Sequence, residues 1–180
     1  AIHCRMPFLH FFDGFRTSHE IQKIEVLDYD DMSRLVDWDA VRRFKARALN
    51  SEHPTVRNTV QNPDTFFQHR EACNGAYDRL PAIVEEYMKA VSDLTGRDYQ
   101  LFNYYGAPDA EEVIVIMCSG AETVKDTVDY LNRKGRKVGM VQVHLYRPFS
   151  IRHFVDAIPA TCKKIAVLDR TKEPGSQGEP

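Results

Sequence analysis

The sequence predicts an α/β fold, a three-layer domain that is built on a parallel sheet and preceded by a helical connector. Three short apolar segments, residues 112–118, 138–145 and 165–168, alternate with helical patterns. Strands joined by helices through short links indicate right-handed crossovers and therefore parallel strands. Strands that are apolar along their whole length are typical of a sheet covered by helices on both faces.

The composition excludes several classes of function. Hydrophobic residues make up 43% of the 180 residues, and the formal net charge is −2. This charge supplies no field that would attract nucleic acid or an anionic membrane. No apolar run reaches the roughly 20 residues that a membrane span needs. The 4 cysteines are far apart and include no CxxC pair, so we expect neither a metal site nor an iron–sulfur site. We expect Cys118, at the end of an apolar strand, to be a small buried side chain.

The beginning of the chain predicts two strands around a turn. Residues 6–12 are aromatic and read as an extended segment, and Asp13 and Gly14 favour a turn. Residues 21–27 alternate imperfectly between apolar and polar side chains, which predicts a strand with one buried face.

Residues 30–98 predict a helical connector. Two short helices are expected at residues 30–36 and 38–49. In the second of them, Trp38 and Arg42 lie four residues apart. Either these two side chains stack on each other, or Trp38 anchors the connector to a neighbouring domain.

The strongest helical pattern covers residues 62–95. Asn62 and Pro63 suit the start of a helix, and Gly96 suits its end. Because proline lacks a backbone donor, we expect Pro81 to kink this helix or to divide it. An apolar stripe at spacings of three and four predicts a core face rather than a cofactor site. Its members are Cys73, Tyr77, Leu80, Val84, Tyr87, Met88 and Val91.

The last third of the chain predicts the sheet and its crossovers. Residues 121–133 form one expected helix, which Gly135 ends, and a shorter helix runs to residue 157. Residues 104–106 are expected in a loop, where exposed tyrosines would mark a docking surface. The carboxyl ends of parallel strands meet at one edge of a sheet. The loops that should share this edge are residues 119–120, 145–150 and 169–175.

Ser119 and Gly120 are a candidate site for an anion. They open the predicted helix directly after a buried strand, where free N–H groups attract anions and glycine permits a close approach. Two interpretations remain open. Ser119 caps the helix with its own hydroxyl, or a phosphate, a sulfate or a neighbouring acidic side chain lies there. The GxGxxG fingerprint is missing, so dinucleotide binding has little support.

Two further polar clusters are candidate contact sites. Arg16, Thr17 and His19 lie in a dense polar turn that has no HxxxH or HxxH spacing for a metal. Ser18 and His19 are adjacent in the sequence, but adjacency alone does not make a nucleophile and its base. We expect this polar turn to face the rest of the first domain. Mixed charges at the end of the third strand are expected to contact another domain or to grip a phosphate. They are Asp169, Arg170 and Lys172. No residue is assigned a catalytic role.

Several longer strings point to one family. They are PFLHFFDGFRTSHE at residues 7–20, NGAY at 74–77, CSGA at 118–121 and LDRTKEPG at 168–175. Together they closely resemble the pyruvate:ferredoxin/flavodoxin oxidoreductases of the large single-chain type, in the order expected along the chain.

The resemblance implies a domain organisation and a reaction. Residues 1–29 would end a thiamine-binding domain, residues 30–98 would be the connector, and residues 99–180 would form a truncated domain that resembles the transketolase carboxyl-terminal domain. The full-length parent would oxidatively decarboxylate pyruvate to acetyl-CoA and CO2, passing electrons to ferredoxin or flavodoxin. The resemblance also implies thiamine diphosphate, Mg2+ and [4Fe–4S] clusters in other parts of the parent, a homodimer and a cytoplasmic location.

This piece of the parent is expected to be structural and to lack activity by itself. Its last apolar strand runs into a loop in which the sequence ends, and its first residue, Ala1, is not an initiator Met. We therefore expect these residues to belong to a longer polypeptide. One alternative is a stand-alone flavodoxin-like domain that binds a nucleotide or phosphate ligand. Another is an unrelated 2-oxoacid dehydrogenase subunit, against which the LDRTKEPG string argues.

Overall fold

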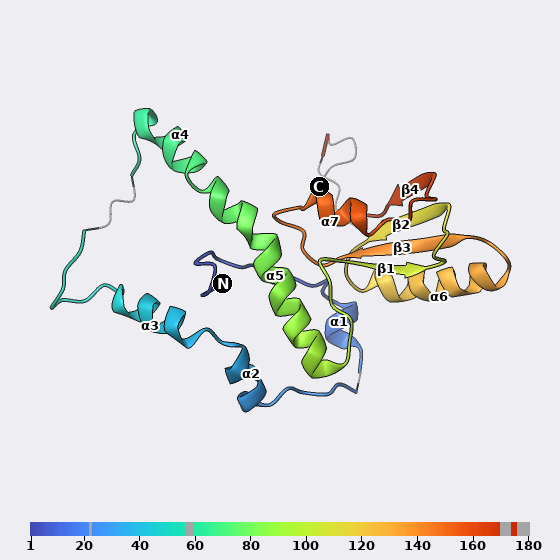
Figure 1. Cartoon of the computed structure of the whole chain (residues 1–180), viewed down its shortest axis with the longest axis horizontal. Helices are drawn as coiled ribbons and strands as arrows, with labels where there is room; N and C mark the ends of the chain where they lie inside the picture. The colour runs from blue at the N-terminus through green and yellow to red at the C-terminus, as the bar shows by residue number, and fades with distance from the viewer. Residues whose placement is uncertain (22, 57–59, 170–173, 176–180) are drawn as a thin grey trace.

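A computed structural model describes the chain except for residues 22, 57–59, 170–173 and 176–180. One long helix and several short ones occupy one side of the molecule, and a small sheet occupies the other (Figure 1). Within the described residues the sheet has 4 strands in the order β1-β3-β2-β4. They are β1 (Phe102–Gly106), β2 (Glu112–Ile116), β3 (Val138–Val143) and β4 (Lys164–Val167).

The three predicted parallel strands are confirmed. β2 pairs in parallel with β3 on one side and with β4 on the other. The sheet is only mostly parallel, however, because β1 pairs with β3 in the antiparallel direction. The expectation of a loop at residues 104–106 was therefore wrong. Local sequence gave no alternation that would reveal this strand, and its pairing partner lies far along the chain.

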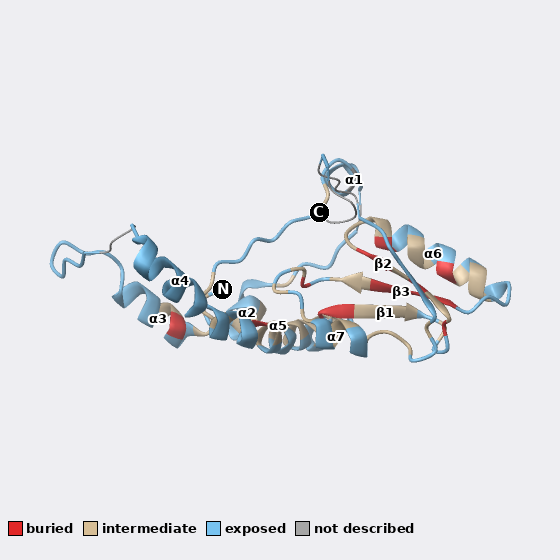
Figure 2. Ribbon diagram, turned by 90° about the horizontal axis from the view of Figure 1, so that it is seen from above, coloured by how far each residue is buried: buried red, intermediate tan, exposed pale blue. Residues whose placement is uncertain are grey.

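Helices lie on both faces of the sheet. β2 leads into α6 (Gly120–Arg133), and β3 leads into α7 (Ile151–Asp156). Figure 2 shows α6 on one face, with α7 and α5 (Asn74–Thr95) on the other. This is the arrangement that crossovers between parallel strands require when the sheet must be covered on both sides.

Two apolar clusters, one on each face, form the core. The α6 side contains Met140 of β3 and Val128 of α6. The opposite side contains Val141 of β3, against which Met88 of α5 and Phe154 of α7 pack. Alternate residues of a strand point to opposite faces, so neighbouring positions in β3 serve both clusters. In contrast, β4 is exposed along its length, although the sequence reads as a buried strand.

The first part of the chain is helical and little buried. Its described helices are α1 (Arg16–His19), α2 (Tyr29–Leu35), α3 (Trp38–Ala46) and α4 (Pro63–Glu71). Carboxylates begin two of them, since Asp28 accepts a hydrogen bond from Asp31 N–H at 2.7 Å and Asp37 accepts one from Ala40 N–H at 2.8 Å. Both short helices of the connector are confirmed, with α3 ending three residues earlier than expected.

The two strands expected at residues 6–12 and 21–27 were wrong. The described residues there form no strand, and side chains such as Leu9 and Val26 are exposed. An extended segment becomes a strand only when another strand satisfies its N–H and C=O groups, and no neighbour does so here. Alternation alone could not supply that partner.

The helix expected over residues 62–95 is divided, but not at Pro81. α4 begins at Pro63 as predicted. A turn at residues 72–73 interrupts the helix, and α5 then runs through Pro81. The break lies beside Asn74 and Gly75, which are both poor helix formers. The predicted end is confirmed, because Gly96 has a φ of 69° and its N–H bonds the Ser92 carbonyl at 2.8 Å.

At Gly139 of β3 the backbone lies directly against the Tyr104 ring of the neighbouring strand. A methyl group at this position would overlap the Tyr104 ring of β1, and the Tyr104 hydroxyl donates to the Ala107 carbonyl. We expect Gly139→Ala to lower the free energy of unfolding by about 1–3 kcal/mol, because overpacking displaces the ring and its hydrogen bond. Urea unfolding measures this. Gly75→Ala is the matched control in a helix and should stabilise the chain slightly. Equal stability of Gly139→Ala and the wild type would contradict the packing described here.

Candidate functional site

A crevice opens at the carboxyl ends of β2 and β3. The chain leaves β2 toward α6 on one face and leaves β3 toward α7 on the other. Neighbouring strands whose connections diverge in this way form the usual ligand-binding crevice of α/β sheets. Here the cavity measures about 480 Å³. Its lining comes from residues 9–13, 17, 88, 117–119, 142–144 and 146.

Asp13 occupies the amino-terminal end of α6 inside this crevice. Its Oδ1 accepts a hydrogen bond from the Ser119 N–H at 3.1 Å, and its Oδ2 accepts one from the Ser119 hydroxyl. The Thr17 hydroxyl donates to Oδ1 at 3.4 Å. A carboxylate therefore lies where a bound anion would lie, and the helix dipole favours its charge.

This geometry decides between the two interpretations of Ser119. Its hydroxyl makes no hydrogen bond to α6, so Ser119 does not cap the helix with its own side chain. A neighbouring acidic side chain, which was one of the alternatives, takes that place. Steric contact explains why residue 120 is a glycine, since a Cβ there would come within 2.9 Å of Ile116 Cδ1. The glycine lets α6 start close against β2.

The expected cluster at residues 16–20 is only partly assembled. Arg16, Thr17 and His19 all lie in α1, and the Thr17 hydroxyl contacts Asp13. His19 Nδ1 lies 2.7 Å from the Phe15 carbonyl and 3.0 Å from Ser18 Oγ. A carbonyl oxygen cannot donate a hydrogen bond, so Nδ1 of His19 must carry the proton. Nδ1 therefore cannot accept a hydrogen bond from the Ser18 hydroxyl. The Ser18 hydroxyl donates to the same carbonyl at 3.2 Å. These two side chains thus do not form a nucleophile and base.

Two groups in the crevice were missed by the sequence reasoning. His144 follows β3, and protein atoms crowded around its ring lower its pKa below the ordinary value, although part of the side chain remains exposed. Tyr146 meets the Phe11 ring edge-on, with centroids 6.4 Å apart. Their place directly after an apolar strand was a signal, because that position faces the ligand edge of a parallel sheet.

Cys118 also lines the crevice. Its φ of 61° places it in the left-handed region, at the sharp turn between β2 and α6. The side chain is half-buried rather than fully buried, contrary to expectation.

The polar end of β4 is incompletely described. Asp169 follows the strand and is exposed, and the Leu168 N–H bonds the Val115 carbonyl at 2.9 Å. Arg170 and Lys172 lie outside the described residues. β4 runs parallel to β2, so this end of the strand shares an edge with the crevice.

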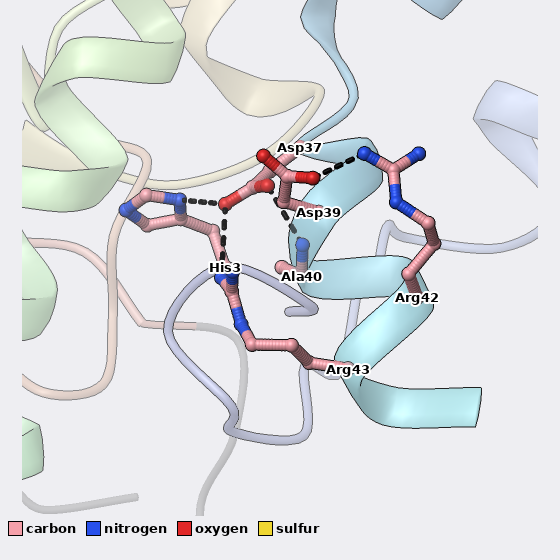
Figure 3. A network of polar contacts seen from close by, with 6 residues as sticks. All are labelled: His3, Asp37, Asp39, Ala40, Arg42 and Arg43. Atoms are coloured by element: carbon pink, nitrogen blue, oxygen red, sulfur yellow. Dashed lines mark hydrogen bonds and ion pairs between the residues drawn. The ribbon is translucent and has the colours of Figure 1, made fainter. Parts of the chain in front are cut away.

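A second polar network ties the amino terminus to α3 (Figure 3). His3 Nδ1 and Asp37 Oδ2 are 2.9 Å apart, and Arg43 lies 3.9 Å from the same oxygen. The Ala40 N–H lowers the pKa of Asp37 most, followed by the hydrogen bond with His3. The network borders an apolar hollow of about 490 Å³. Its members cap a helix and hold a segment in place, and nothing in their geometry points to catalysis.

The stacking expected between Trp38 and Arg42 gives way to other contacts. Arg42 pairs with Asp39, and the Trp38 indole N–H donates to the Ser33 carbonyl at 3.0 Å. The alternative, in which Trp38 anchors the connector to a neighbouring domain, stays a prediction.

The described residues offer neither a metal-binding cluster nor a membrane-spanning helix. Among those residues, no group of 3 or more His, Cys, Asp or Glu side chains is arranged to hold a metal ion. None of the helices described has both the length and the apolar character that a membrane span requires.

Comparisons with known proteins agree with the family strings. A family model described as "Pyruvate flavodoxin/ferredoxin oxidoreductase, thiamine diP-bdg" matches residues 1–89. A second, "Pyruvate:ferredoxin oxidoreductase core domain II", matches residues 110–179. A pyruvate-flavodoxin oxidoreductase from Enterobacter agglomerans is 63% identical, and a pyruvate:ferredoxin oxidoreductase from Moorella thermoacetica is 61% identical. A pyruvate-flavodoxin oxidoreductase from Klebsiella pneumoniae is 58% identical.

Each of these alignments covers 100% of the chain and 15% of the relative. The chain therefore belongs to the pyruvate:ferredoxin/flavodoxin oxidoreductase family, as its sequence motifs indicated. It spans about 15% of the length of these relatives.

The network around Asp37 predicts a definite pH dependence. A carboxyl group whose pKa is depressed in the folded state contributes stability above its unfolded pKa and loses it as the pH falls through the folded pKa. We expect wild type to unfold at higher urea than Asp37→Asn at pH 7. The difference should shrink as the pH falls below 3.8, the ordinary pKa of the group. Asp39→Asn, on the same helix, is the control. A difference for Asp37→Asn that did not change with pH would contradict this assignment.

Proposed function

We propose that the chain is part of an enzyme that oxidatively decarboxylates pyruvate to acetyl-CoA and CO2 and passes the electrons to ferredoxin or flavodoxin. The observation that carries this proposal is the 63% identity, over all 180 residues, to a pyruvate-flavodoxin oxidoreductase. Such identity, spread over both matched regions, supports the same reaction class for the parent enzyme. The reaction itself belongs to the parent enzyme, of which this chain supplies one portion.

The reactive cofactors belong to other portions of the parent. Thiamine diphosphate would supply the decarboxylation chemistry, with Mg2+ at its diphosphate, and [4Fe–4S] clusters would carry the electrons. The residues of this chain do not fit a cluster, because its cysteines are dispersed over the fold. Cys4 lies by the amino terminus, Cys73 between α4 and α5, Cys118 in the crevice and Cys162 before β4. We therefore assign no cofactor ligand and no catalytic residue here.

The contribution of this chain is to hold domains together. We propose that residues 1–29 end the thiamine-binding domain, residues 30–98 form a connector and residues 99–180 form a domain like the transketolase carboxyl-terminal domain. The support is physical. Val84 and Met88 of α5 pack on the core of the sheet, so the connector and the sheet domain share buried surface.

Exposed apolar side chains support packing against further protein. On β4 and just after it, Ile165 is 50% exposed, Val167 69% and Leu168 49%. A contiguous apolar strand at the edge of a sheet is costly in water and marks a surface that other protein covers. We propose that neighbouring parts of the parent cover it. Asp169, Arg170 and Lys172 follow this strand, and we infer that they contact another domain or coenzyme A.

The remaining assignments extend the same proposal. We propose that Arg16 and His19, which lie in α1 together with the crevice-lining Thr17, face the rest of the thiamine-binding domain. A homodimeric parent in the cytoplasm agrees with the family resemblance.

The direct test uses the complete protein that contains this chain. We expect pyruvate to reduce ferredoxin or flavodoxin in the presence of coenzyme A, and the 180-residue chain alone to show neither this activity nor the visible absorbance of iron–sulfur clusters. A coloured, active 180-residue chain would overturn the domain assignment. Saturable binding of a flavin or nucleotide by this chain, without pyruvate oxidation in the complete protein, would favour the stand-alone binding domain instead.

Arg170 provides a separate test in the complete protein. We expect Arg170→Ala to weaken domain assembly or to raise the KM for coenzyme A, because a bidentate donor is lost. Thiamine diphosphate should remain bound, as measured by its release on denaturation. Arg152→Ala, which removes an exposed arginine paired with Asp156 at 3.7 Å, is the control. Loss of thiamine diphosphate from Arg170→Ala would contradict the proposed role.

A further inference from the structure

The segment before α2 lies across the mouth of the crevice. Residues 9–13 and Thr17 line it from one side, while residues that follow β2 and β3 line it from the other. α1 stands beside the amino-terminal end of α6 in both views (Figures 1 and 2). We refer to residues 9–17 as the strap.

Among the side chains that the structure describes, an aromatic contact and a polar anchor attach the strap to the sheet domain. Phe11 meets Tyr146 edge-on, and both rings keep substantial contact with solvent. The hydrogen bonds from Ser119 to Asp13 join residues 106 positions apart in the sequence. Leu9, Phe12 and Phe15 of the strap are 85%, 60% and 78% exposed. Burial thus contributes little, and the polar anchor must contribute much of the attachment.

The negative charge of the Asp13 carboxylate, which anchors the strap, suits its place at the amino-terminal end of α6. A carboxylate that accepts hydrogen bonds from a backbone N–H and a hydroxyl at a helix start meets the positive end of the helix dipole. Thr17 orients the same carboxylate from within the strap. Asp13 lies within the first family-matched region and Ser119 within the second, so the anchor couples two separately recognised parts of the chain.

We propose that Asp13 is a latch that holds the strap closed over the crevice, and that breaking it opens the strap while the sheet domain stays folded. Opening would uncover more of the crevice lining, including half-buried Cys118. The inference does not depend on the reaction of the parent enzyme, because it concerns only contacts within this chain.

The test measures local opening through Cys118. The 180-residue chain is treated with iodoacetamide, and the alkylation rate of each cysteine is followed by peptide mass spectrometry. Hydrogen bonds to a charged group contribute more than neutral ones, so Asp13→Ala should raise the open fraction, and with it the Cys118 rate, about tenfold. Exposed Cys73 and half-buried Cys162, which lie outside the crevice lining, should react at unchanged rates. Exchange of the Ser119 amide hydrogen should accelerate in parallel.

Further variants separate the latch from general destabilisation. Asp39→Ala, which removes another carboxylate with an ion pair, should leave the Cys118 rate unchanged. Asp13→Asn keeps one acceptor oxygen and should give an intermediate rate. The effect of Asp13→Ala should be smaller when Ser119 is already alanine, because the two side chains share a hydrogen bond.

Three outcomes would overturn the proposal. They are an unchanged Cys118 rate in Asp13→Ala, fully additive effects with Ser119→Ala, and equal acceleration of Cys118 and Cys162 in both Asp13 variants. The last outcome would show that Asp13 supports the whole fold rather than the strap. None of these readouts measures pyruvate oxidation, so failure of the latch and failure of the proposed function are distinguishable.

Discussion

The burial of β3 on both faces is the constraint on which the rest of the sheet domain depends. Met140 and Val141 are among the largest fully buried side chains, and each belongs to a different core cluster. Adjacent residues of one strand can both be buried only if helices cover both sides of the sheet. α6 covers one side, while α5 and α7 cover the other. The parallel pairing of β2 with β3 then fixes the crossover that carries α6.

That covering also places the crevice. Because the connections after β2 and β3 diverge to opposite faces, the loops at their carboxyl ends cannot close over each other. The gap must be filled by a ligand, by water or by another part of the chain. Here the strap lines one side of the gap, and its Asp13 carboxylate lies at the start of α6. The start of α6, where an anion could bind, is thus occupied by a carboxylate of the same chain.

The helical part has a different physical basis. In α2 and α4 no described residue is buried, α3 buries Ala40 alone, and α5 buries Leu80 alone. α2, α3 and α4 are short and exposed and gain little from packing, so caps and local ion pairs carry much of their stability. The contacts of α5 with the sheet and the pair between His3 and Asp37 attach this part to the remainder. Its exposed apolar residues are the observation behind the proposal that other parts of the parent enzyme cover this surface.

The sequence by itself determined the elements whose cause is local. Apolar runs specified β2, β3 and β4. Pro63 and Gly96 set helix ends through their restricted or permissive φ angles, and long family-specific strings identified the family. The same local logic did not place the division of the helix, which lies at residues 72–73 while α5 runs through Pro81, and it was wrong for residues 6–12, where a strand pattern found no partner.

Only the tertiary structure decided which distant groups meet. β1 exists because β3 offers it an edge, and Asp13 reaches Ser119 because the strap crosses the crevice. His3 likewise finds Asp37 only after α3 is placed. The spacing of these partners along the chain carries no periodic signal. Their contact energies arise only once the intervening chain has folded, and that is why local propensity and pattern could not reveal them.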